Sequence, residues 1–121
     1  MKLLKLNHDF SVCKVQDISQ VDFGDEFIFL SKTDDEISLV CDTDRIPGNT
    51  TEVEKGWKAL KIDGILDFSM VGVISNISRI LAGAGISIFV VSTFNTDYIL
   101  LKDHSFEKSL DLLRAAGYET A

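Results

Sequence analysis

Hydrophobic and polar positions follow two different periods along residues 57–120, and the changes of period predict strands and helices. Residues 57–62 alternate apolar and polar side chains, as does a strand with one buried face. Ser69 suits the N-cap of a helix. Gly83 and Gly85 supply the left-handed conformation with which many helices end. Between them, apolar residues recur on one helical face at Met70, Val73, Ile74, Ile77, Ile80, Leu81 and Ala84.

A hairpin and a second helix follow. Residues 86–92 are rich in the β-branched side chains of buried strands, residues 93–97 have turn chemistry, and residues 98–102 form the return strand. Phe106, Leu110 and Leu113 mark the second helix, Gly117 ends it, and residues 118–120 form a short last strand. The predicted order is β-α-β-β-α-β, which is the ferredoxin-like arrangement of an α+β protein.

The first half of the chain repeats part of this pattern. Residues 27–40 align without a gap beneath residues 88–101, so that Ser31 meets Ser92 and Glu36 meets Asp97. An internal duplication leaves self-similarity of this kind. Two unrelated hairpins would also share an apolar, turn, apolar pattern, so both origins are open at this point.

The two copies are predicted to be unequal. Residues 16–26 alone separate a first strand at residues 10–15 from the hairpin, so the first copy has either lost most of its first helix or keeps one turn near residues 18–23. After Cys41, Pro47 and Gly48 leave room for at most one turn of helix. We therefore predict a tandem, with a degenerate N-terminal unit at residues 1–52 and a full C-terminal unit at residues 53–121.

Composition and charge narrow the classes of function. The 121 residues are 45% hydrophobic, which suffices for a core, and their net charge of −7 repels phosphate backbones. We therefore expect no nucleic-acid partner. No apolar run reaches the length of a signal peptide or a membrane span, and Cys13 and Cys41 fit small buried strand residues in a reducing cytosol. The prediction is a cytoplasmic protein with no membrane partner.

The residue patterns of most enzymes and metalloproteins are not found in the sequence. No Ser or Cys lies in a nucleophile motif, no carboxylate pair is evident, and no glycine loop suits a phosphate. His8 and His104 are isolated, and the acidic residues 34–36 lack the glycine and spacing of a calcium loop. We expect no catalytic residues, no metal and no cofactor.

Three stretches of the second half resemble a known family. They are LDFSMVGV at residues 66–73, LAGAGISIF at residues 81–89 and STFNTDYIL at residues 92–100. Together they resemble an ACT domain, and among such proteins the tandem-ACT type of the CASTOR arginine sensors and of the aspartokinase regulatory region. The resemblance covers residues 57–120 and is weaker over residues 10–50. It implies the ACT fold, a sensor of small molecules, usually amino acids, without catalysis, and units that pair side by side.

The resemblance also implies a ligand site. In the sensor subfamily, the hairpin turn and the loop that enters the first helix line the amino-acid pocket. By matching position, the ligand-binding residues here are Asp67, Ser69, Met70, Val71, Gly72, Thr93, Phe94 and Asp97. The first unit lacks this loop and has residues 32–36 in place of the turn, so we expect it to bind no ligand.

The chemistry of these residues suits an amino acid without the resemblance. Amides near residues 70–73 begin a helix, where unpaired donors and partial positive charge favour a carboxylate. Asp97 and Asp67 are candidates for an ammonium or cationic side chain, and Phe94 for covering an apolar or guanidinium group. Each has a structural alternative, since Asp97 can cap its own turn, Asp67 can favour the helix dipole, and Phe94 can be a core residue.

Three hypotheses of function follow from the sequence. The first is a non-catalytic regulatory or sensor protein that binds an amino acid or similar small ligand and acts on a regulated enzyme or signalling protein. We expect a homodimer, because the edges of an open sheet must be paired or covered. The second is an interaction module of the same fold that no longer binds a ligand. The third is a small enzyme, which would need converging acid–base groups that the sequence hardly offers.

Overall fold

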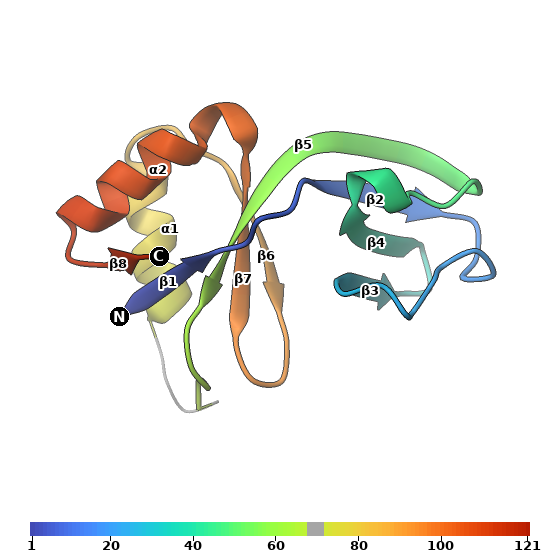
Figure 1. Cartoon of the computed structure of the whole chain (residues 1–121), viewed down its shortest axis with the longest axis horizontal. Coiled ribbons are helices and arrows are strands. Elements are labelled where there is room, and N and C mark those ends of the chain that lie inside the picture. Colours follow the sequence, from blue (N-terminus) through green and yellow to red (C-terminus); the bar gives the residue numbers. More distant parts are fainter. Residues whose placement is uncertain (68–71) are drawn as a thin grey trace. The chain divides into compact units, whose positions relative to one another are not determined.

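The computed structural model describes residues 1–67 and 72–121, which form two compact units (Figure 1). The C-terminal unit consists of Met1–Asn7 and Lys58–Ala121, and the N-terminal unit consists of His8–Trp57. Strand β5 (Thr50–Ile62) contributes its first part to one unit and its last part to the other. The predicted division between residues 52 and 53 stays a prediction, and the observed units differ from it in that residues 1–7 join the C-terminal unit.

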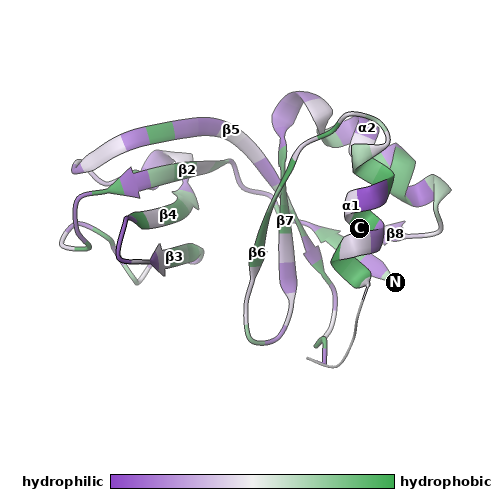
Figure 2. Cartoon of the chain, turned by 180° about the vertical axis from the view of Figure 1, so that it is seen from behind, coloured by the Kyte–Doolittle hydropathy of each residue, from purple (hydrophilic) through white to green (hydrophobic). Residues whose placement is uncertain are grey.

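The C-terminal unit has the element order that the sequence predicts. After β5 come α1 (Val73–Ala82), β6 (Ile88–Ser92), β7 (Asp97–Lys102), α2 (Asp103–Ala115) and β8 (Glu119–Thr120). Both helices show alternating hydrophobic and hydrophilic bands (Figure 2), as expected for helices packed by one face. The unit is therefore an α+β structure consistent with the ferredoxin-like fold.

One strand of the C-terminal unit was not predicted. Strand β1 (Lys2–Lys5) lies between β5 and β8 in the sheet, antiparallel to β5 and parallel to β8. Leu3 pairs with Ile62 of β5 and with Thr120 of β8, and it is fully buried. The order of strands in this unit is β8-β1-β5-β7-β6.

The core of the C-terminal unit lies between this sheet and the two helices. Alternate residues of the strands face the helices, and α1 and α2 contribute the residues that helical spacing predicts. Burial of each of these aliphatic side chains stabilises the folded state by about 1.5–3 kcal/mol relative to leaving it exposed to water. The buried residues of this core are Leu3, Leu60, Ile62, Ile77, Leu81, Ile86, Ile99, Leu101, Leu110 and Leu113.

The ends of α1 differ in part from the prediction. The N-cap is Gly72, whose φ of 82° is left-handed, whereas the predicted N-cap, Ser69, lies outside the described residues. At the other end Gly85, with a φ of 73°, supplies the left-handed residue, and the amide of Ile86 donates to Leu81 O at 3.0 Å. Gly83 keeps a right-handed conformation, so of the two predicted glycines only Gly85 has this role.

The N-terminal unit has a similar sheet with almost no helix. Strands β2 (Phe10–Val15), β3 (Ile28–Lys32) and β4 (Ile37–Asp42) join β5 in the antiparallel order β3-β4-β2-β5. Residues 16–27 contain turns and no helix, and a three-residue 3₁₀ helix, η1 (Thr43–Arg45), follows β4. The prediction of at most one helical turn after Cys41 is confirmed.

The alignment of the two hairpins is wrong by one residue. Strands β3 and β6 begin at Ile28 and Ile88 and end at Lys32 and Ser92, so equivalent positions are sixty residues apart. Lys32 therefore takes the place of Ser92, and Ile37, rather than Glu36, takes the place of Asp97. A shift of one residue exchanges the two faces of a strand, so no carboxylate in the first hairpin is equivalent to that of Asp97.

The two cysteines are buried strand residues, as predicted. Cys13 is 3% exposed and Cys41 is fully buried, and both belong to the core of the N-terminal unit with Val15 and Leu39. Burial raises the pKa of the Cys13 thiol and raises the pKa of Cys41 to about 12. Both thiols are therefore protonated at neutral pH and protected from reagents in the folded state.

Alkaline pH is expected to destabilise the fold through Cys41. The pKa of this thiol is about 12 in the folded protein and 9.0 in an exposed chain. The stabilisation of the folded state that comes from burying the protonated thiol is therefore fully present below pH 9. Between pH 9 and 12 the unfolded chain binds fewer protons, and the free energy of unfolding falls as the pH rises. Urea unfolding over this range should give a shallower fall for Cys41→Ala than for the wild type. Equal slopes would contradict the role of Cys41.

Candidate functional site

The turn between β6 and β7 is fixed by hydrogen bonds between two threonines. The Thr93 amide and hydroxyl both donate to Thr96 O, at 2.8 and 3.0 Å, and the Thr96 amide donates to Thr93 Oγ1 at 3.4 Å. The Thr96 side chain is 5% exposed, and its hydroxyl donates to Ile62 O at 2.8 Å. The turn is therefore attached to the end of β5 by a buried hydrogen bond.

The loop that follows β5 lies against this turn. The Leu66 amide donates to Asn95 O at 2.7 Å, so the backbone two residues beyond Gly64 is joined directly to the tip of the hairpin. Gly64 has a φ of 92°, a conformation that lets the chain leave the strand and turn toward the hairpin. Two loops that are about thirty residues apart in sequence are thereby brought to one edge of the C-terminal unit, in agreement with what the resemblance implies.

Helix α1 begins beside the same edge. Gly72 has no side chain with which to cap the helix, and the first intrahelical bond is donated by the Asn76 amide to Gly72 O at 2.9 Å. The amides of residues 73–75 come before Asn76, the first residue whose amide donates to an acceptor within the helix. They occupy the part of a helix where donors have no intrahelical acceptor and where the helix dipole favours negative charge.

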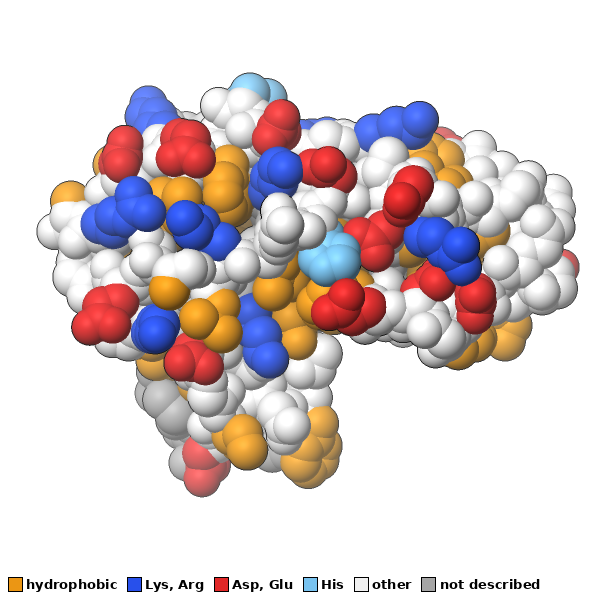
Figure 3. All heavy atoms as spheres, viewed as in Figure 1, with side chains coloured by type: hydrophobic (Ala, Val, Ile, Leu, Met, Phe, Trp, Pro, Cys, Tyr) orange, Lys and Arg blue, Asp and Glu red, His pale blue; other side chains and the backbone are white. Residues whose placement is uncertain are grey.

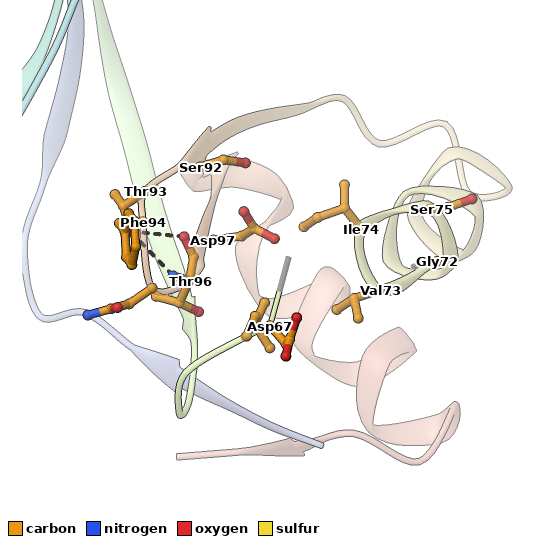
Figure 4. A pocket seen from close by; sticks show the side chains of 12 residues that line it. Asp67, Gly72, Val73, Ile74, Ser75, Ser92, Thr93, Phe94, Thr96 and Asp97 are labelled. Atoms are coloured by element: carbon orange, nitrogen blue, oxygen red, sulfur yellow. Dashed lines mark hydrogen bonds between the residues drawn. The ribbon is translucent and has the colours of Figure 1, made fainter. Parts of the chain in front are cut away.

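The turn between β6 and β7, the loop after β5 and the start of α1 border a cavity of about 300 Å³. In Figure 4, Asp97 extends from the hairpin, Asp67 from the loop, and Val73 and Ile74 from the start of α1 toward the space between them. Phe94 lies at the hairpin tip and is 79% exposed. The lining residues are Leu66, Asp67, Gly72, Val73, Ile74, Ser75, Ser92, Thr93, Phe94, Asn95, Thr96 and Asp97.

The charged side chains that line the cavity are all of one sign. Among the described residues that line the cavity, Asp67 and Asp97 are the charged ones, and both are acidic. They favour a positively charged group, whereas the start of α1 favours a negatively charged one. Val73 and Ile74 add apolar surface between these two regions. The arrangement is suited to a small molecule that carries both charges.

The structure brings together every predicted site residue that it describes. Asp67, Gly72, Thr93, Phe94 and Asp97 all line the one cavity. Ser69, Met70 and Val71 lie outside the described residues. A ligand-binding role for all eight stays a prediction.

Thr96, Val73 and Ile74 line the cavity but are not among the residues predicted to form the site. The available signal was the second threonine of the STFNTD segment, three positions after Thr93, the spacing at which a threonine hydroxyl can bond to the turn backbone. Val73 and Ile74 were assigned to the core face of the helix alone, and they remain half-buried because they border the cavity.

Other regions of the described structure offer fewer groups suited to binding or catalysis than the first cavity. A second cavity of about 360 Å³ lies between the start of α1 and the turn after α2, where Asn76 Nδ2 donates to Tyr118 Oη at 2.6 Å. His8 Nδ1 contacts Asp42 Oδ1 at 2.7 Å in the N-terminal unit. Within residues 1–67 and 72–121, no three His, Cys, Asp or Glu side chains are grouped as metal ligands, and no helix is long and apolar enough to cross a membrane.

Two family models match the chain. One, described as an ACT domain, matches residues 52–115, and the other, described only as an N-terminal domain, matches residues 8–49. No curated protein matches the chain.

Solved structures match over almost the whole length. Protein Atu0741 from Agobacterium tumefaciens is 35% identical, with a TM-score of 0.87 over 99% of this chain and 91% of that one. Aspartate kinase from Clostridium acetobutylicum, described as an allosteric enzyme, is 15% identical, with a TM-score of 0.66 over 94% of this chain and 33% of that one. A proposed C-terminal regulatory domain of aspartate kinase from Porphyromonas gingivalis is 19% identical, with a TM-score of 0.56 over 93% and 92%. The last two share the fold.

The hydrogen bond from Thr96 to Ile62 should matter for stability. Thr96→Val keeps the shape of the side chain but leaves the buried carbonyl of Ile62 without this donor, which typically costs about 1–3 kcal/mol. Thr51→Val is the control: its hydroxyl donates to Lys14 O at 3.3 Å, but at an exposed position where water can replace it, so the free energy of unfolding should change by less than about 0.5 kcal/mol. Urea unfolding measures both. Equal stabilities of the two variants would show that the turn is held in another way.

Proposed function

Because the chain belongs to the ACT domain family, in the type found in aspartokinase regulatory domains, we propose that it is a regulatory protein that binds an amino acid. The proposed site is the cavity between the hairpin turn and the start of α1. The observation that supports it most is that two carboxylates and a helix N-terminus, which favour opposite charges, border one cavity. The protein would have no catalytic activity of its own.

The ligand carboxylate is assigned to the start of α1. The amides of residues 73–75 are directed along the helix axis toward its N-terminus, and Gly72 allows a ligand to approach the backbone closely. The predicted residues Ser69, Met70 and Val71 would complete this side of the site. A carboxylate there would accept hydrogen bonds from the backbone and would interact favourably with the helix dipole.

The ligand ammonium is assigned to Asp97. This residue is half-buried at the first position of β7, so its carboxylate is held by the strand rather than by a free loop. Asp67 lies on the other loop, where it would meet the ammonium or a polar group of the ligand side chain. Thr93 and Phe94 would border the ligand at the hairpin, with Phe94 covering its apolar or cationic part.

We also propose that the two units arose by duplication and that the N-terminal unit is the degenerate copy. Both hairpins have a threonine at the first position of the turn, and Thr33 N donates to Glu36 O at 2.9 Å as Thr93 N donates to Thr96 O. Helix α2 and η1 also begin sixty residues apart, at Asp103 and Thr43. The N-terminal copy would bind no ligand, because Ile37 replaces Asp97 and residues 16–27 form no helix.

A homodimer completes the proposal. Strand β6 is hydrogen-bonded to β7 on one side, and among the described strands it has no neighbour on the other. Such an edge invites pairing with a second chain. In this reading the protein is cytoplasmic, and ligand binding changes how the dimer acts on a regulated enzyme or signalling protein.

Binding of an amino acid to the wild-type protein tests the function directly. Isothermal titration calorimetry against the twenty standard amino acids should find at least one that binds, and Asp97→Asn should weaken that binding by about tenfold or more because it removes the partner of the ammonium. Glu36→Gln removes one negative charge from the turn of the other hairpin and is the matched control.

Two results would count against this site. If no amino acid binds while the dimer stays folded, the chain is better described as an interaction module that has lost its ligand. If Glu36→Gln weakens binding as much as Asp97→Asn does, the loss reflects net charge rather than a contact at the cavity.

The homodimer is tested by light scattering. We expect a particle of twice the chain mass of 13.4 kDa at micromolar concentration, because an unpaired β6 edge would otherwise face solvent. A particle with the mass of one chain at that concentration would contradict the dimer and leave the ligand site unaffected.

A further inference from the structure

The net negative charge of the protein belongs entirely to the N-terminal unit. Residues 8–57 contain 12 acidic and four basic residues, a net charge of −8, whereas the rest of the chain contains seven acidic and eight basic residues, a net charge of +1. On the face shown in Figure 3, basic and acidic side chains are interspersed over the C-terminal unit, whereas acidic ones predominate over the N-terminal unit. The net negative charge of the N-terminal unit favours the approach of positively charged molecules.

The segment at residues 16–27 places two large apolar side chains on this acidic unit. Ile18 is 47% exposed and Phe23 is 61% exposed, on the same loop and five positions apart. Single exposed apolar residues are common and need no explanation. Two of them on one loop, in the place where the C-terminal unit has helix α1, are a more specific feature.

The loop is held at its start by side-chain contacts to its own backbone and to residues 48–49. Asn49 Nδ2 donates to Asp17 O at 3.1 Å and to Asp17 Oδ1 at 3.0 Å, and the Ser19 amide donates to Asp17 Oδ1 at 2.9 Å. The hydrogen bonds from Ser19 and Asn49 lower the pKa of Asp17, which is therefore charged at neutral pH. The Gly48 amide donates to Gln20 Oε1 at 3.1 Å.

The later part of the loop is held by an arginine. Arg45 Nη2 contacts Asp22 Oδ2 at 3.0 Å and Asp25 Oδ1 at 2.8 Å, and the Gly24 amide donates to Asp22 Oδ1 at 2.9 Å. These bonds lie on both sides of Phe23, so the backbone that presents its ring is fixed. A rigid loop that presents an exposed aromatic side chain loses little entropy on binding a partner.

The charge around the two apolar residues selects the class of partner. Asp17, Asp22, Asp25, Glu26 and Asp44 surround them in sequence or through Arg45, and Arg45 is the one basic residue within residues 16–27 and 43–46. Nucleic acids and anionic membranes would be repelled by this net negative charge. A basic protein segment would be attracted, and its approach would be accelerated.

We propose that residues 16–27 and 43–46, which we call the loop surface, dock a basic protein segment that inserts an apolar side chain against Ile18 and Phe23. Arg45 neutralises only part of the negative charge of this surface, and the remainder would attract Lys or Arg of that segment, while the two apolar residues would provide most of the affinity. This assigns contact with a target to the N-terminal unit, and it does not depend on ligand binding in the C-terminal unit.

The test uses the full chain and a synthetic amphipathic peptide of Lys and Leu residues. Backbone amide NMR signals of residues 16–27 and 43–46 should shift on titration, with little change for the same peptide carrying Glu in place of Lys or Ser in place of Leu. Phe23→Ser should weaken binding about tenfold or more. Val53→Ser, at an exposed apolar position of the same unit, should bind like the wild type.

Each other outcome overturns the proposal. Equal affinities of Phe23→Ser and Val53→Ser would show binding by charge alone, and shifts elsewhere would place the contact on another surface. Binding of the Glu peptide with the same affinity would exclude a basic partner. If Phe23→Ser instead turns a dimer into a monomer in light scattering, the loop surface is an interface between copies of this chain.

Discussion

The geometry of the candidate site depends on one buried hydrogen bond, from Thr96 Oγ1 to Ile62 O. It joins the tip of a hairpin to the end of the strand from which the loop toward α1 departs. The bond between Leu66 N and Asn95 O then aligns that loop with the turn. Both contacts are accepted by backbone carbonyls of neighbouring segments, so the hairpin turn and the loop after β5 keep a fixed position relative to each other. Side chains at the edge can then vary without altering the frame that supports them.

The two hairpins have the same backbone arrangement but differ in the side chain at the first position of the second strand. Both have the same lengths, the same turn hydrogen bond and the same spacing along the chain. In one of them the first residue after the turn is Asp97, half-buried at the cavity, and in the other it is Ile37, packed against the core of the N-terminal unit. An apolar side chain at this position packs against the core, whereas a carboxylate there lines the cavity.

Much of the C-terminal unit could be predicted from the sequence because most of its helices and strands have a single, clear periodicity of hydrophobic and polar residues. The helix residues Ile77 and Leu81 and the strand residues Ile99 and Leu101 are buried as their spacing requires. The loops of the site could be located, since turn residues interrupt these periods. The register of the first hairpin could not, because two apolar runs align equally well when shifted by one residue. Strand β1 was missed for another reason: four residues have no period, and their place is set by pairing with distant segments.

The pairing of β1 has a consequence for how the chain assembles during synthesis. Lys2 pairs with Glu119, so β1 and β8, the first and last strands of the C-terminal unit, are neighbours in its sheet, and residues 8–57 of the N-terminal unit lie between them in sequence. The strands of the N-terminal unit are close in sequence and can pair as soon as residue 57 has left the ribosome. Strand β1 can pair with β8 only after residue 120 has been made. Because loop closure between Lys2 and Glu119 costs more entropy than pairing of strands close in sequence, we expect the N-terminal unit to form before β1 pairs with β8.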